Sequence, residues 1–138
     1  MATVLVVDDH SGTRNGLVTL LQRWGYRALT APAADVAFVI VNTEKPDLVI
    51  LDEMMPGMTG LEFLQRLHAM PSTAELPVIV YSASDSRRLA ADAIRYGAKE
   101  FWLKGKIEPA LIQQRLLKYI TPLPPHCARD GRIAALPY

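Results

Sequence analysis

The sequence predicts an α/β protein in which a parallel β-sheet is covered by helices on both faces. Five short apolar runs alternate with segments whose apolar residues recur at helical spacing, and this alternation is typical of repeated strand-helix units. The chain has 138 residues, of which 50% are hydrophobic, so it is long and apolar enough to bury one core.

The first strand is expected over residues 3–8, and the second over residues 26–30. Between them lies a helix that ends at Gly25, a natural C-terminal stop. Its apolar residues recur at helical spacing, namely Leu17, Leu20, Leu21 and Trp24.

The second helix is expected over about residues 33–43, with Pro32 near its first turn and Pro46 beyond its end. The third strand follows over residues 47–52. The third helix lies between the turn at Pro56-Gly57 and Pro71. Its apolar positions are Leu61, Phe63, Leu64 and Leu67.

The fourth strand is expected over residues 77–82, and the fifth over residues 99–103. The fourth helix, about 86–96, has Asp85 as its expected cap and Gly97 as its end. The fifth helix, about 108–120, has Pro109 at its start. The inner faces of these two helices are expected to consist of Leu89, Ala93 and Ile94, and of Leu111, Ile112, Leu116 and Ile120.

The composition changes after Ile120, where Thr121-Pro122-Leu123-Pro124-Pro125 has the sequence of an extended, polyproline-like segment. We therefore expect one domain over residues 1–120, followed by a Pro-rich tail or linker over residues 121–138.

Charge and cysteine content limit the partners and the compartment. The 15 basic and 14 acidic residues give a formal net charge of +1 without a basic stripe, so nucleic acid is not an expected partner. Cys127 is the single cysteine and cannot form an internal disulfide, which fits a reducing compartment. No apolar run approaches membrane-spanning length, so we expect a cytoplasmic location and no membrane contact.

Acidic residues follow two of the predicted strands. Asp8 and Asp9 end the first strand, and Asp52 ends the third. In neighbouring parallel strands these carboxylates meet at one edge of the sheet, where a divalent cation that prefers hard oxygen ligands relieves their mutual repulsion. The alternative is that adjacent acids merely cap a helix or are solvated in a loop. Ser82 and Lys104 end two further strands, and the combination supplies a metal site, a nucleophile and two donors to phosphate oxygens.

Over roughly residues 2–120 the chain resembles the receiver domain of bacterial two-component response regulators. The residues that carry the resemblance are Asp8-Asp9, Asp52 with Met55-Pro56-Gly57 and Gly60, Ser82-Ala83, and Gly97-Ala98 leading through Phe101 to Lys104. The resemblance implies a doubly wound, flavodoxin-like three-layer fold with five parallel strands in the order 2-1-3-4-5.

The same resemblance implies a phosphoacceptor signalling domain that is not an enzyme acting on other molecules. Asp52 would accept a phosphoryl group from a sensor histidine kinase, a phosphotransfer protein or a small donor. Lys104 and Ser82 would neutralise phosphoryl oxygens. Mg²⁺ would be held by Asp9 directly, by Asp8 mainly through water, and by Asp52 and the backbone carbonyl of Met54.

The output implied by the family is a movement of Ser82 followed by inward rotation of Phe101. This movement would reshape the face formed by the helices at 86–96 and 108–120 and the strand at 99–103, for a downstream protein target. Phe101 could instead be an ordinary core residue. Because it lacks a hydroxyl, it can be buried without a hydrogen-bond partner, so we expect an easily reached inward state. Trp102 is assigned to packing.

Several positions depart from the usual receiver pattern. Gly105 stands where the family usually has proline, so a cis Lys-Pro bond is excluded and a different or more mobile loop is expected. Met54 and Ser84 stand where receivers control the access of water to the acyl phosphate, and we hypothesise that the apolar Met54 prolongs the phosphorylated state. Glu100 fits a pattern of complementary charges at the dimer interface of some receivers, but Ala90 and Gln114 do not, so that dimer is not predicted.

The helix at 33–43 carries Val36 and Val39 where the family typically has charged residues. With Ile40 they are either isolated surface residues or a contact surface for a partner, the tail or a second copy of the chain.

Three other functions fit part of the pattern. A flavin-binding electron carrier has the same fold class, but Asp8 and Asp9 would repel the flavin phosphate. A phosphatase of the haloacid dehalogenase type expects a second acid two residues after the nucleophile, where this chain has Met54. A degenerate receiver would act as a protein-interaction module without being phosphorylated, although every acid that the reaction needs is present.

Overall fold

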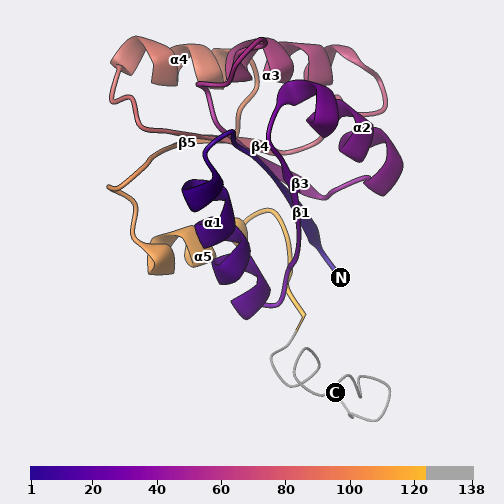
Figure 1. The fold of residues 1–138 in the computed structure, drawn as a ribbon, viewed down its shortest axis with the longest axis vertical. Coiled ribbons are helices and arrows are strands. Elements are labelled where there is room, and N and C mark those ends of the chain that lie inside the picture. Colours follow the sequence, from indigo (N-terminus) through magenta and orange to yellow (C-terminus); the bar gives the residue numbers. More distant parts are fainter. Residues whose placement is uncertain (124–138) are drawn as a thin grey trace.

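The computed structural model describes residues 1–123; residues 124–138, including Cys127 and most of the predicted tail, lie outside the described part. Strands and helices alternate along the chain (Figure 1). In chain order they are β1 (Thr3–Val7), α1 (Ser11–Arg23), β2 (Arg27–Ala31), α2 (Ala34–Glu44), β3 (Leu48–Leu51), α3 (Gly60–Ala69), β4 (Val78–Ser82), α4 (Arg87–Arg95), β5 (Glu100–Leu103) and α5 (Pro109–Leu116).

The strands form one parallel sheet in the order β2-β1-β3-β4-β5, which confirms the predicted doubly wound, flavodoxin-like topology. The order reverses at β1, so β1 and β3 are neighbours although a strand and two helices separate them in the sequence. In an open α/β sheet such a reversal creates a crevice at the carboxyl ends of the strands. Among residues 1–123, no helix is long and apolar enough to cross a membrane.

Helices cover both faces of the sheet. Figure 1 shows α2, α3 and α4 on one face and α1 and α5 on the other. Successive strand residues point to opposite faces, so Leu5 and Val7 join the apolar cluster under α2, α3 and α4, whereas Val4 and Val6 join the cluster under α1 and α5. All five residues of β1 are buried, as expected for a central parallel strand.

The strand register brings the carboxyl ends together. Val7 lies opposite Leu51 in β3, and Ser82 lies opposite Leu103 in β5. The residues that directly follow β1, β3 and β5 therefore emerge at the same edge of the sheet, beside Ser82 at the end of β4.

Two helix ends differ from the sequence prediction. The cap of α4 is Ser86, whose hydroxyl accepts a hydrogen bond from the Leu89 N–H at 3.2 Å, and not Asp85. Helix α5 ends at Leu116 rather than near residue 120, because the chain then tightens into turns in which the Lys118 N–H donates to the Arg115 carbonyl. Ile120 is nevertheless buried, so its predicted place in the core is confirmed.

The inner faces predicted for α4 and α5 were each wrong at one residue. Ile94 is 50% exposed and Leu111 is 44% exposed, whereas Ala93 and Ile112 are buried. These short helices flank the edge strand β5, and each presents only a narrow buried row to the sheet. Both apolar side chains therefore lie at the protein surface.

Helix α2 exposes the two valines that the sequence singled out. Val36 is 39% exposed and Val39 is 61% exposed, while Ile40 is partly buried against the core. An exposed apolar pair is thus confirmed, and a partner for it stays a prediction.

Candidate functional site

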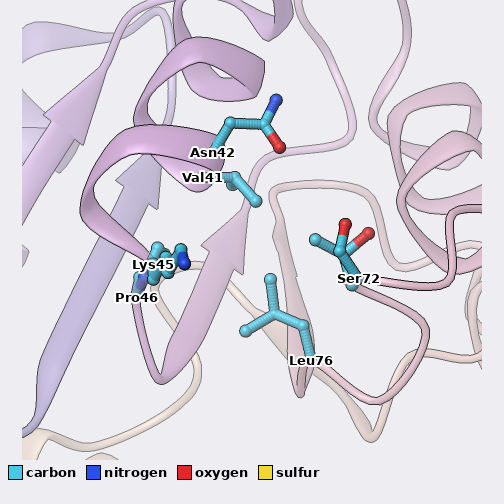
Figure 2. A pocket seen from close by; sticks show the side chains of 7 residues that line it. Val41, Asn42, Lys45, Pro46, Ser72 and Leu76 are labelled. Carbon is cyan, nitrogen blue, oxygen red and sulfur yellow. The ribbon is translucent and has the colours of Figure 1, made fainter.

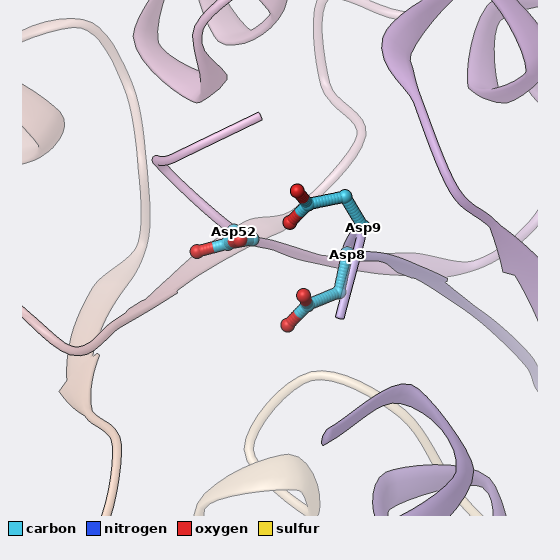
Figure 3. Close-up of side chains that lie close together, drawn as sticks. All are labelled: Asp8, Asp9 and Asp52. Carbon is cyan, nitrogen blue, oxygen red and sulfur yellow. The ribbon is translucent and has the colours of Figure 1, made fainter. Parts of the chain in front are cut away.

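Three carboxylates meet at the carboxyl edge of the sheet. Asp8 and Asp9 follow β1, and Asp52 follows the neighbouring strand β3. Each side chain offers one oxygen such that all three oxygens lie within 4.8 Å of one another, and Figure 3 shows the carboxylates converging. Asp8 and Asp52 are buried and Asp9 is exposed, so the cluster has a solvent-facing side. The geometry is compatible with a hard divalent cation.

Lys104 brings an ammonium group into this cluster from the end of β5. Its Nζ lies 2.8 Å from Asp8 Oδ2 and 3.4 Å from Asp52 Oδ1, and its side chain is only 18% exposed. Burial alone would lower the pKa of Lys104, but its hydrogen bond to Asp8 and the charge of Asp52 outweigh that effect and raise it. Lys104 therefore stays charged and links the two buried acids.

The ionised form of Asp52 is unfavourable in the folded protein although this ammonium group lies nearby; we call this unfavourable ionisation the strain on Asp52. Burial raises the pKa of its carboxyl to about 6, and the charge of Asp8 adds to the rise, while Lys104 and the Met54 N–H oppose it. The Met54 N–H donates to Asp52 Oδ1 at 3.4 Å, and the Met54 side chain is 68% exposed. A cation bound beside Asp52 would relieve this strain by favouring its ionised form.

The turns around the acids are fixed by short-range contacts. The His10 N–H donates to Asp8 Oδ1 at 2.8 Å, and the His10 side chain caps α1 by accepting from the Thr13 N–H. Gly60 lies so close to the Asp52 backbone that an added Cβ would be 2.4 Å from the Asp52 carbonyl oxygen. The start of α3 can therefore pack against the acid turn only because residue 60 has no side chain.

Ser82 lies fully buried at the end of β4, and its Oγ accepts a hydrogen bond from the Ser84 N–H at 3.1 Å. Phe101 is partly buried and packs against the cluster under α2, α3 and α4. Their placement at the acid edge and on β5 agrees with the expectation, while their roles as donor and switch stay predictions.

Gly105, which directly follows Lys104, has a backbone φ of 78°. Proline is restricted to φ near −65°, so it cannot adopt this conformation. The loop that carries Lys104 thus has a shape that the usual family proline would not permit.

Sequence reasoning missed Arg14 and Tyr81. The Arg14 Nη1 donates to the Asp8 carbonyl at 2.8 Å, and Lys104 Nζ lies 5.7 Å from the centroid of the Tyr81 ring. The available signal for Arg14 was a basic residue in the first turn of the helix that follows the acid pair, from which a long side chain extends back toward the strand.

The Glu100 carboxylate accepts hydrogen bonds from three side chains of the same chain. It accepts from Trp102 Nε1 at 2.8 Å, from Arg115 Nε and Nη2 at 2.9 Å each, and from the Tyr119 hydroxyl at 2.6 Å. Burial alone would raise the pKa of Glu100, but the hydrogen bonds from Arg115, Tyr119 and Trp102 outweigh it and lower it. Glu100 therefore links β5 to α5 and to Tyr119, and its fit to the charge pattern of a receiver dimer stays untested. Trp102 is buried, in agreement with its assignment to packing.

A separate cavity of about 200 Å³ lies between the end of α2 and the segment that leads into β4 (Figure 2). Its lining residues are Val41, Asn42, Lys45, Pro46, Ser72, Thr73 and Leu76. Lys45 and Pro46 precede β3, and Leu76 precedes β4, so the cavity lies at the amino ends of the strands. It is distinct from the acid cluster.

A doubly wound α/β domain with three acids and a lysine at its carboxyl edge has the architecture of a receiver. Comparison with known proteins agrees, since the response regulator receiver domain matches residues 4–116. The chain belongs to this family of signalling domains in two-component systems.

Individual relatives and solved structures support the assignment. Protein PilH of Pseudomonas aeruginosa is 29% identical over 113 residues, which cover 82% of this chain and 93% of PilH. The phosphate regulon transcriptional regulatory protein PhoB of the same organism is 31% identical over 102 residues, which cover 74% of this chain but only 44% of PhoB. The chemotaxis protein CheY4 of Vibrio cholerae superimposes with a TM-score of 0.80 at 27% identity, over 87% of this chain and 99% of CheY4.

Proposed function

We propose that this chain is an active receiver in which Asp52 accepts a phosphoryl group. The observation that carries the proposal is the cluster itself: three carboxylate oxygens within 4.8 Å of one another, with the Lys104 ammonium 3.4 Å from Asp52. A degenerate receiver has no need of a buried, strained acid at this position.

In the proposed reaction an Asp52 carboxylate oxygen attacks phosphorus. The new O–P bond forms as the bond from phosphorus to the donor's imidazole nitrogen or acyl oxygen breaks, and the leaving atom keeps the electron pair. Phosphoryl transfer has a loose transition state, so it depends mainly on positioning and charge neutralisation. Lys104 would neutralise one phosphoryl oxygen, and the Ser82 hydroxyl would donate to another.

The cation that fits the donor set is Mg²⁺. Asp8, Asp9, Asp52 and the Met54 carbonyl are all hard oxygen donors, and Mg²⁺ usually keeps several waters beside a few carboxylates. When bound, the ion would neutralise charge that develops on the phosphoryl oxygens. The high pKa of Asp52, about 6 with burial and Asp8 as its causes, supports a cation here because the ion favours the carboxylate.

The partners follow from the proposed chemistry. The donor is a sensor histidine kinase or a phosphotransfer protein, as membership of the family implies. The output is a protein contact through α4, β5 and α5, triggered by Ser82 and Phe101. Leu111 is exposed and lines a surface hollow together with Phe101 and Leu103 of β5, which supports this face as a contact surface.

The domain boundary is part of the proposal. Residues 1–120 form the receiver, and residues 121–138 form a Pro-rich tail or linker. The start of this segment contacts the receiver, since the Leu123 N–H donates to the Gly25 carbonyl at 3.1 Å.

Acetyl phosphate supplies a direct test. We expect the parent protein to gain one phosphoryl group in the presence of Mg²⁺, as measured by intact mass, and to gain none when the metal is chelated. Asp52→Asn should remain unmodified. Modification of both proteins, or of neither, contradicts the proposal.

A further inference from the structure

Arg14 is a basic residue beside the acid cluster that the proposed reaction does not use. It lies in the first turn of α1 and is partly buried, and its Nη1 donates a 2.8 Å hydrogen bond to the backbone carbonyl of Asp8. That carbonyl belongs to the peptide unit between Asp8 and Asp9, the two acids of the proposed metal site.

The contacts of the two acids are unequal. The Asp8 N–H donates to the Ala31 carbonyl at 3.0 Å, and the Asp8 carboxylate accepts from the His10 N–H and from Lys104, at 2.8 Å each. Asp9 is exposed, and within residues 1–123 no hydrogen bond to its carboxylate is found. The direction of the Asp9 carboxylate therefore depends on the conformation of the backbone at Asp9.

A peptide unit is planar, so fixing the Asp8 carbonyl also fixes the bond that leads to the Asp9 Cα. We propose that Arg14 is a positioning residue for the site of the divalent cation. Arg14 orients the Asp8-Asp9 peptide so that the Asp9 carboxylate lies close to those of Asp8 and Asp52. This inference rests on the proposed function, because it concerns the cation site of the same reaction.

Two effects of Arg14 on a bound cation have opposite signs. Its positive charge repels Mg²⁺, so removal of the charge alone would tighten binding. Its hydrogen bond orders the acid pair, so removal of the bond would weaken binding. The direction in which the Mg²⁺ dissociation constant moves therefore identifies the dominant effect.

The experiment compares Mg²⁺ binding by titration calorimetry for the full chain and three variants. Arg14→Met removes both charge and hydrogen bond, and Arg14→Lys keeps the charge but not the planar fork. Arg23→Met, at the exposed end of the same helix, is the matched control for loss of one positive charge.

We expect Arg14→Met to weaken Mg²⁺ binding by about tenfold, in the range known for groups that orient metal ligands, with a smaller loss in Arg14→Lys. The control should bind like the parent. Phosphorylation of Arg14→Met by acetyl phosphate should recover at saturating Mg²⁺, because the positioning defect acts on cation affinity and leaves Asp52 and Lys104 in place.

Unchanged or tighter binding in Arg14→Met overturns the inference. If that variant does not fold, as judged by circular dichroism, Arg14→Gln takes its place, because its neutral side chain is too short to make the same hydrogen bond, and an unchanged dissociation constant then has the same meaning. Failure of the parent to bind Mg²⁺ contradicts the proposed cation site itself. If the parent and Arg14→Met bind Mg²⁺ equally well, only the role of Arg14 is contradicted.

Discussion

The strain on Asp52 predicts that Asp52→Asn stabilises the metal-free protein at neutral pH. In the folded protein, burial and the charge of Asp8 raise the pKa of Asp52 to about 6, whereas an aspartate in an unfolded chain has a pKa of about 3.9. At a pH between these two pKa values, the Asp52 carboxyl is protonated in the folded state and ionised in the unfolded state. The free energy of unfolding of the parent therefore falls as the pH rises from about 4 to about 6.

The size of the effect follows from the same values. A difference of about 2 in pKa corresponds to about 3 kcal/mol, which is the upper limit of the cost of ionising Asp52 in the folded state. This net cost already includes the attraction of Lys104, which lies 3.4 Å from Asp52 Oδ1, and asparagine, which is neutral like the protonated acid, avoids it. We therefore expect Asp52→Asn to be more stable than the parent by about 1–3 kcal/mol near pH 7, and by much less near pH 4.

Urea unfolding in a chelator, followed by tryptophan fluorescence at several pH values, measures this difference. Comparison of the two proteins at each pH cancels the titration of other groups. Added Mg²⁺ should stabilise the parent more than the variant, because the ion favours the ionised carboxylate. A difference that does not change with pH, or a variant less stable than the parent near pH 7, would show that ionised Asp52 does not destabilise the folded protein.

Three further substitutions test separate parts of the structure. Tyr26→Phe should raise the free energy of unfolding by about 1 kcal/mol in urea unfolding, because the buried Tyr26 hydroxyl has no partner among the described residues; a less stable variant would show that it has one. Gly60→Ala should lower that free energy by about 2 kcal/mol or more, since its Cβ would lie 2.4 Å from the Asp52 carbonyl oxygen, and a neutral result would contradict the close approach. Met54→Asn should shorten the lifetime of the phosphorylated protein, because an amide beside Asp52 can orient water where the thioether cannot; an equal or longer lifetime in a dephosphorylation assay rejects shielding by Met54.

Much of the fold and the acid edge could be predicted from the sequence because the signals are local. Apolar runs define strands, and Asp8 and Asp52 end two of them, so parallel pairing alone brings these acids together. Arg14 and Glu100 could not be interpreted in this way. Their roles depend on which strand and helix lie beside them, and charge alone suggests an exposed residue in both cases.

The helix errors have the same origin. Ile94 and Leu111 follow helical periodicity, but α4 and α5 flank an edge strand and bury a narrower row than periodicity suggests. Asp85 and Ser86 are both good caps, and only the path of the chain decides between them.

The most direct measurement is the position of the phosphoryl group. After incubation with Mg²⁺ and acetyl phosphate, borohydride reduces an acyl phosphate on aspartate to homoserine, which tandem mass spectrometry locates in the sequence. We expect homoserine at position 52 alone, and none there when the metal is chelated. Homoserine at Asp8 or Asp9, or at no aspartate, would contradict this expectation.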